Sequence, residues 1–203
     1  MKLLFENWRK YLNEEIMALE SWPSGYKIEI TKDPKFYGDT AYSIELYRDY
    51  IRQDKKKSQL AAGWLNVDFV NVGSDNDRWL DDCNYEIFDN LYTLHVGVND
   101  NEPRGFGPFL MDLGLELAHK DNKWIIPARL VGGSGNEAAE RIYDFYLDKR
   151  KEDVETIDIN LDCWEEYVDS RVPDDTPESF LYLYRKKPTI INSELAKEVI
   201  KFT

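Results

Sequence analysis

The sequence contains few of the residues that build metal and redox sites. Of its 203 residues, two are cysteine, two are histidine and three are methionine. Cys83 and Cys163 match no zinc-binding or redox spacing, so we expect no metal site and a reducing compartment. No apolar run approaches the roughly 20 residues of a membrane-spanning helix, so we expect no membrane association.

Positive charge is also scarce. Lysine and arginine total 26 against 39 aspartates and glutamates, which gives a net charge of −13. Such a surface repels nucleic acid and anionic membranes, so we expect neither as a partner. It could attract a basic substrate, although acidic surfaces often serve solubility alone. The 42% hydrophobic and 14% aromatic content is typical of a folded globular chain.

Hydrophobic periodicity predicts an α/β fold without internal repeats. An amphipathic helix is expected within residues 1–22, and the Trp22-Pro23-Ser24-Gly25 stop separates it from one domain over residues 26–203. The pattern predicts the following strands: 26–30, 41–50, 59–71, 85–88, 91–98, 124–127 and 180–184. It predicts helices at 108–119, 136–150 and 193–201, and acidic loops over 151–178.

The most informative stretch is a glycine turn between the strand 91–98 and the helix after it, Glu102-Pro103-Arg104-Gly105-Phe106-Gly107-Pro108. Glycines let a backbone approach a ligand, and the first turn of a helix offers unpaired amides and partial positive charge. The turn could therefore hold the pyrophosphate of a nucleotide-like cofactor. The alternative is a tight strand-to-helix turn that binds nothing.

This order of strand, glycine turn and helix, followed by a second helix, resembles the GNAT family of N-acyltransferases. In that family a central strand splays from its neighbour, and a turn of pattern Arg/Gln-x-x-Gly-x-Gly/Ala holds the pyrophosphate of acetyl-CoA. Here the register is Glu102-x-x-Gly105-x-Gly107. The resemblance implies a single GNAT-like domain with a mixed, mostly antiparallel sheet and flanking helices. Glu102 in place of Arg or Gln, and the missing amide of Pro108, depart from the pattern.

The resemblance also implies roles for individual residues. The cofactor-binding set would be Val98, Arg104, Gly105, Phe106, Gly107 and Asn136. Tyr143, in the motif Asn136-x-x-Ala139-x-x-x-Tyr143, would give a proton to the leaving CoA thiolate, and His95 on the preceding strand would serve as a general base. The alternatives are a core tyrosine on a helix and a core histidine.

A narrower resemblance covers roughly residues 91–199. Three segments are similar to GNAT-like proteins of tailed bacteriophages: residues 107–112, the helix from Ser134 to Arg150, and the closing strand Tyr182-Leu183-Tyr184-Arg185-Lys186-Lys187-Pro188-Thr189. The first twelve residues resemble a phage leader that directs proteins into the prohead, and Leu12-Asn13-Glu14 fits a prohead-protease site. An ordinary docking helix is the alternative.

Two functions follow from these patterns. The first is a virion-associated or scaffold protein with a degenerate acyl-CoA site, and its partners would be phage structural proteins or a second copy of the chain. The second is an active acetyl-CoA-dependent N-acetyltransferase acting on an amine. The protein would be found in the phage particle or the host cytoplasm. The sequence names neither the acceptor nor the oligomeric state.

Overall fold

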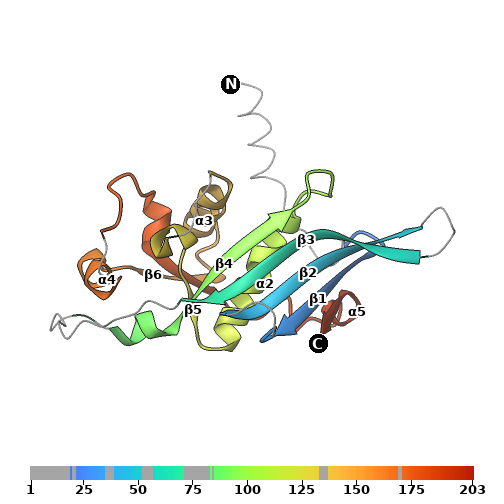
Figure 1. The fold of residues 1–203 in the computed structure, drawn as a ribbon, viewed down its shortest axis with the longest axis horizontal. Helices are drawn as coiled ribbons and strands as arrows, with labels where there is room; N and C mark the ends of the chain where they lie inside the picture. Colours follow the sequence, from blue (N-terminus) through green and yellow to red (C-terminus); the bar gives the residue numbers. More distant parts are fainter. Residues whose placement is uncertain are drawn as a thin grey trace, which may run out of the picture.

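The computed structural model describes residues 19, 22–34, 39–51, 57–70, 83, 85–132, 137–168 and 171–203. Within these residues, eight strands form one sheet in the order β6-β7-β5-β4-β3-β2-β1-β8 (Figure 1). The pairing is antiparallel except between β4 and β5 and between β1 and β8. The predicted α/β class is confirmed. Most of the predicted N-terminal helix lies outside the described residues, as does Asn136.

The first half of the chain is an antiparallel meander. It consists of β1 (Tyr26–Lys32), β2 (Thr40–Ile51), β3 (Lys57–Phe69) and β4 (Leu91–Val98). In β1, and in β3 from Gly63 onward, alternate side chains such as Ile28 and Leu65 are buried on one face, whereas the first four residues of β4 are all buried. The strands predicted at 26–30, 41–50, 59–71 and 91–98 are confirmed.

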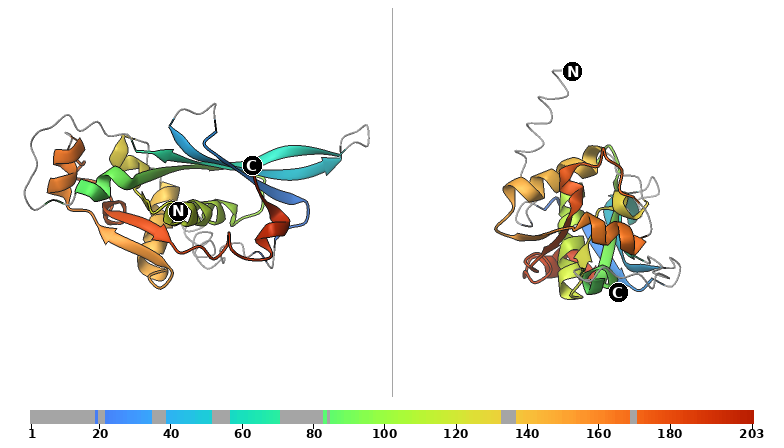
Figure 2. Two further views of the ribbon diagram at one scale, coloured as in Figure 1. Left: turned by 90° about the horizontal axis from the view of Figure 1, so that it is seen from below. Right: turned by 90° about the vertical axis from the view of Figure 1, so that its left-hand side faces the viewer.

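The second half brings the helices and the remaining strands. The elements are α2 (Phe106–Lys120), β5 (Trp124–Ile125), η3 (Ala128–Val131), α3 (Glu137–Lys149), β6 (Val154–Asp158), α4 (Leu161–Val168), η4 (Glu178–Leu181), β7 (Tyr182–Lys186), α5 (Ala196–Val199) and β8 (Ile200–Phe202). Figure 2 shows α2 running along one face of the sheet beneath β1–β4. The two long helices predicted after the glycine turn are confirmed, and β5 is shorter than predicted.

Two predicted segments were wrong. The expected strand at 85–88 is a 3-10 helix, η2 (Tyr85–Asn90), because a helical turn brings Phe88 against Trp164 and Tyr167, with ring centroids 5.2 Å from each. The expected acidic loops at 151–178 contain β6 and α4. In α4 the buried residues recur at helical spacing, and they were hidden among acidic neighbours.

The C-terminal helix is also shorter than expected. It covers one turn, α5, and the chain then forms β8 parallel to β1, with Ile28 opposite Ile200. The predicted strand at 180–184 begins as η4 and becomes extended only at Tyr182. The end of α5 is set by the pairing of β8 with the edge strand β1 rather than by the local hydrophobic period.

A disulfide joins Cys83, just before η2, to Cys163 on α4, with 5.6 Å between the Cα atoms. It lies beside a second core formed by Phe88, Ile126, Trp164, Leu183 and their neighbours. The sequence led us to expect a reducing compartment. The disulfide disagrees with that expectation, because disulfides persist mainly in oxidising surroundings.

The two described glycines inside α2 should respond oppositely to alanine. A Cβ at Gly107 would meet nothing within 4 Å, whereas one at Gly114 would lie 2.9 Å from Leu94 Cδ2 and 3.1 Å from Leu65 Cδ2. We expect Gly107→Ala to stabilise the protein by up to about 1 kcal/mol through helix propensity. We expect Gly114→Ala to destabilise it by about 1–2 kcal/mol through overpacking. Urea unfolding measures both, and equal shifts would contradict the packing of α2 on β3 and β4.

Candidate functional site

The glycine turn forms where β4 ends and α2 begins. Gly105 precedes the helix with φ of 92°, in the left-handed region that glycine adopts without strain, and its carbonyl accepts the amide of Phe109 at 3.1 Å. The amides of Phe106 and Gly107 fall in the first turn, where a helix has no partner for them. The space beside Gly107 is open. The turn thus has the geometry of an anion cradle, with Arg104 exposed just before it.

The strand that leads into this turn separates from β5. Parallel pairing joins the two strands only at Leu91–Trp124 and Tyr92–Ile125, while β4 continues to Val98 paired with β3. Val98 therefore lies at the end of β4 that has diverged from β5. The divergence expected between these two strands is present.

Glu102 does not face the cradle. Its carboxylate accepts a hydrogen bond from the Tyr26 hydroxyl at 2.6 Å and lies 3.5 Å from Arg48 Nη1, and its side chain is 2% exposed. Both partners belong to β1 and β2. The charge that departs from the family pattern is thus compensated inside the protein and turned away from the first turn of α2.

His95 lies on the sheet face turned away from α2, which we call the outer face and which also carries Ser43, Glu45, Trp64 and Asn66. Its Nε2 is 3.6 Å from the Asp68 carboxylate, and the side chain is 43% exposed. Its neighbour Leu94 points the other way, toward α2. The imidazole is therefore a half-exposed surface group rather than a core histidine.

Tyr143 is enclosed by aromatic rings in the main core. Its ring centroid is 4.8 Å from that of Tyr184 and 5.6 Å from that of Phe180, and the residue is 3% exposed. Burial raises the pKa of its phenol. The Phe106 side chain is also in the core, 4.9 Å from the Tyr26 ring, so only its backbone is available to a ligand. The structure therefore does not bring Tyr143 and His95 together.

A buried charge network was missed by the sequence analysis. Asp112 and Glu116 lie one turn apart on α2 and are buried with Lys186 of β7. Asp112 accepts hydrogen bonds from Tyr146 at 2.8 Å and from Arg150 at 3.0 and 3.1 Å, and Lys186 donates to Glu116. The sequence does contain one indication of this network, since two carboxylates lie four residues apart in an otherwise apolar helix. All their charges are paired, which suits a structural role.

The part of the chain that the structure describes contains no cluster of three or more histidine, cysteine, aspartate or glutamate side chains able to hold a metal ion. None of its described helices is both long enough and apolar enough to cross a membrane. In comparisons with known proteins, no protein-family model, no curated protein and no solved structure matches the chain.

The tyrosines should make the fold sensitive to alkali. Burial and a hydrogen bond to Asp89 raise the pKa of Tyr167 to about 12, and burial raises that of Tyr143. Because these values exceed about 10 for an unfolded tyrosine, the stabilisation is full below that pH and is lost as pH rises through the folded values. We expect tyrosinate absorbance from these groups to appear together with loss of near-ultraviolet circular dichroism. Full ionisation near the ordinary value in a folded protein would contradict the enclosure of Tyr143.

Proposed function

We propose that the chain is a GNAT-like phage protein that acts by binding, in a virion-associated or scaffold role, and that its acyl-CoA site is degenerate. The observation that supports this most is the enclosure of Tyr143. A general acid must come within hydrogen-bond reach of the leaving sulfur, and a phenol packed among Tyr184 and Phe180 does not offer its proton to a cofactor. Its raised pKa also makes it a weaker acid.

The position of His95 supports the same proposal. Acyl transfer needs the base that deprotonates the amine and the acid that protonates the thiolate at one reacting centre. His95 is exposed on the outer face beside Asp68, whereas α2 and Tyr143 lie in the core beneath the sheet. The cradle at Gly105 and Gly107 is thus left without convergent catalytic groups.

The alternative is an active N-acetyltransferase, and the cradle geometry favours it. The amides of Phe106 and Gly107, with Arg104 nearby, fit a pyrophosphate, and acetyl-CoA would supply the acyl thioester. An acceptor amine would attack the thioester carbonyl, an amide bond would form as the C–S bond breaks, and the thiolate would leave with a proton from Tyr143. The proton released by the amine would return the tyrosinate to its neutral form. The backbone at Val98 would position the thioester.

Titration with acetyl-CoA separates the two functions. We expect no saturable binding of acetyl-CoA below about 1 mM. The first turn of α2 is the only group of amides in the cradle, and Pro108 has no N–H to add, so the affinity for a pyrophosphate should be low. Gly107→Glu places negative charge in the cradle, and Gly107→Ala is its size control. Micromolar binding that Gly107→Glu abolishes, with turnover lost in Tyr143→Phe while binding is retained, would establish the acyltransferase instead.

The virion role is tested on the particles themselves. If the leader is a packaging signal cut after Leu12-Asn13-Glu14, the protein recovered from purified particles should begin at Glu15. Mass spectrometry of the N-terminal peptide, compared with the same protein from infected-cell lysate, measures this. Intact Met1 in particles would contradict the cleavage, and absence of the protein from particles would contradict the virion role.

A further inference from the structure

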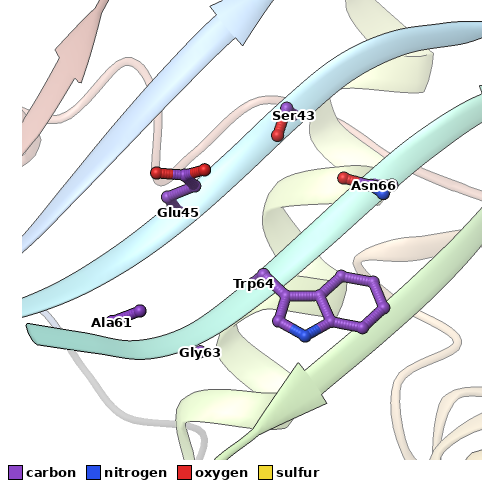
Figure 3. Close-up of a pocket in the computed structure, with 6 residues that line it drawn as sticks. All are labelled: Ser43, Glu45, Ala61, Gly63, Trp64 and Asn66. Carbon is purple, nitrogen blue, oxygen red and sulfur yellow. The ribbon is translucent and has the colours of Figure 1, made fainter. Parts of the chain in front are cut away.

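The outer face of the sheet has a shallow hollow near its centre. The hollow has a volume of about 350 Å³ and is lined by Ser43, Glu45, Ala61, Gly63, Trp64 and Asn66 (Figure 3). All of these residues belong to β2 and β3, so the lining is held by paired strands rather than by loops. A site on such strands keeps its side chains in fixed positions.

Trp64 forms a rigid aromatic platform beside this hollow. A Cβ at Gly97, its cross-strand partner on β4, would lie 2.6 Å from Trp64 Nε1 and 2.8 Å from Cε2. The indole therefore lies against the backbone of β4, and glycine is required there because any side chain would displace it. The residue is nevertheless 46% exposed, so an indole surface remains open to a ligand.

Glu45 is the cross-strand neighbour of Trp64 on β2, and it adds a carboxylate to the hollow. The register places one row of residues across the sheet, in the order Lys201, Glu29, Glu45, Trp64 and Gly97. Glu29 and Glu45 are directly opposed, an arrangement that destabilises an antiparallel pair. Lys201 Nζ is 3.4 Å from Glu29 Oε1, whereas Glu45 has no ion pair among the described residues. A cation at the hollow would complete the row.

Ser43 adds a hydroxyl group to the lining of the hollow. It lines the hollow and is 8% exposed. Its hydroxyl has no hydrogen-bond partner within the described ranges and is accessible from the hollow, so it is available to a ligand. Asn66, directly opposite Ser43 on β3, adds an amide to the same rim. The hollow thus combines an aromatic surface, one anion and two unused hydrogen-bonding groups.

We propose that this hollow binds an organic cation, an alkylammonium or guanidinium group such as the side chain of lysine or arginine. Tryptophan is the strongest cation–π partner among side chains, and a carboxylate beside it adds an ion pair. The net charge of −13 draws cations to the surface and disfavours nucleic acid. The site is independent of the proposed function, because it lies across the sheet from α2 and requires no acetyl-CoA.

The test compares a cation with its uncharged isostere. Nα-acetyl-arginine amide is titrated by calorimetry against Nα-acetyl-citrulline amide, which has the same shape without the charge. We expect millimolar affinity for the arginine derivative and binding about tenfold weaker for citrulline, a difference of about 1.4 kcal/mol. A short arginine-glycine peptide and free tetramethylammonium form two further arms. If the peptide binds more tightly than the single arginine derivative, the site is assigned to a polypeptide partner. If the peptide, the arginine derivative and tetramethylammonium bind with equal affinity, the site is assigned to small amines.

Variants on the same row make the test specific. Glu45→Gln and Trp64→Leu should each weaken arginine binding about tenfold. Glu29→Gln is the matched control, because it removes a carboxylate one strand away that Lys201 already pairs, and affinity should change less than twofold. Glu45→Gln also relieves the opposition to Glu29, so thermal melting should show no loss of stability.

Four results would overturn the proposal. The first is equal binding of the arginine and citrulline derivatives. The second is arginine binding that survives Glu45→Gln in a folded protein. The third is binding of methyl glucoside that needs Trp64 but not Glu45, which would assign the platform to a saccharide. Absence of binding by every cation up to about 50 mM would overturn it as well, since a site that weak has no physiological occupancy.

Discussion

The arrangement of the domain depends on two carboxylates buried on one helix. Asp112 and Glu116 of α2 lie in an otherwise apolar core, where unpaired charges would be very costly. Each is satisfied by a different part of the chain. Asp112 takes Arg150 and Tyr146 from the end of α3, and Glu116 takes Lys186 from β7. Burial raises the pKa of Asp112, while the charges of Arg150 and Lys186 act to lower it.

Glu116 also directs the last part of the chain. It accepts the amides of Ile190 and Ile191 at 2.9 and 3.0 Å, and the hydroxyl of Thr189 at 2.9 Å. These bonds hold the segment after β7 across α2, and in Figure 2 this segment passes beneath the helix toward α5. The crossing brings β8 to the opposite edge of the sheet, beside β1. The buried carboxylate of Glu116 thus fixes the path of the segment between β7 and α5 through hydrogen bonds to residues distant in the sequence.

The local sequence pattern was sufficient to predict those strands and helices whose apolar side chains pack into the core beside them. The strands β1 to β4 and the helix after Gly105 could be predicted from the apolar residues within each segment, whereas the strand predicted at 85–88 was wrong. The carboxylates of α2 could not be placed, because their partners come from 34 to 75 residues later in the chain. The same holds for Cys83 and Cys163, which are 80 residues apart. At the candidate site, the turn was predictable, whereas the enclosure of Tyr143 depends on Tyr184 and Phe180 from distant elements.

The exposure of the outer face follows from the connections between strands. The antiparallel neighbours β1, β2 and β3 are joined by short segments, whereas the parallel pair β4 and β5 requires a crossover, which α2 supplies on the opposite face. α2 therefore does not cover the outer face of β1–β4, whose residues are mainly polar, as is typical of an antiparallel sheet with one wet face. Trp64 departs from that rule, because it is 46% exposed on this face. Its indole rests on Gly97, a residue unfavourable within a strand, so the chain carries both an exposed aromatic side chain and a weakened strand at the same point. Neither feature improves the core, and their coincidence beside the uncompensated Glu45 is what a binding surface would require.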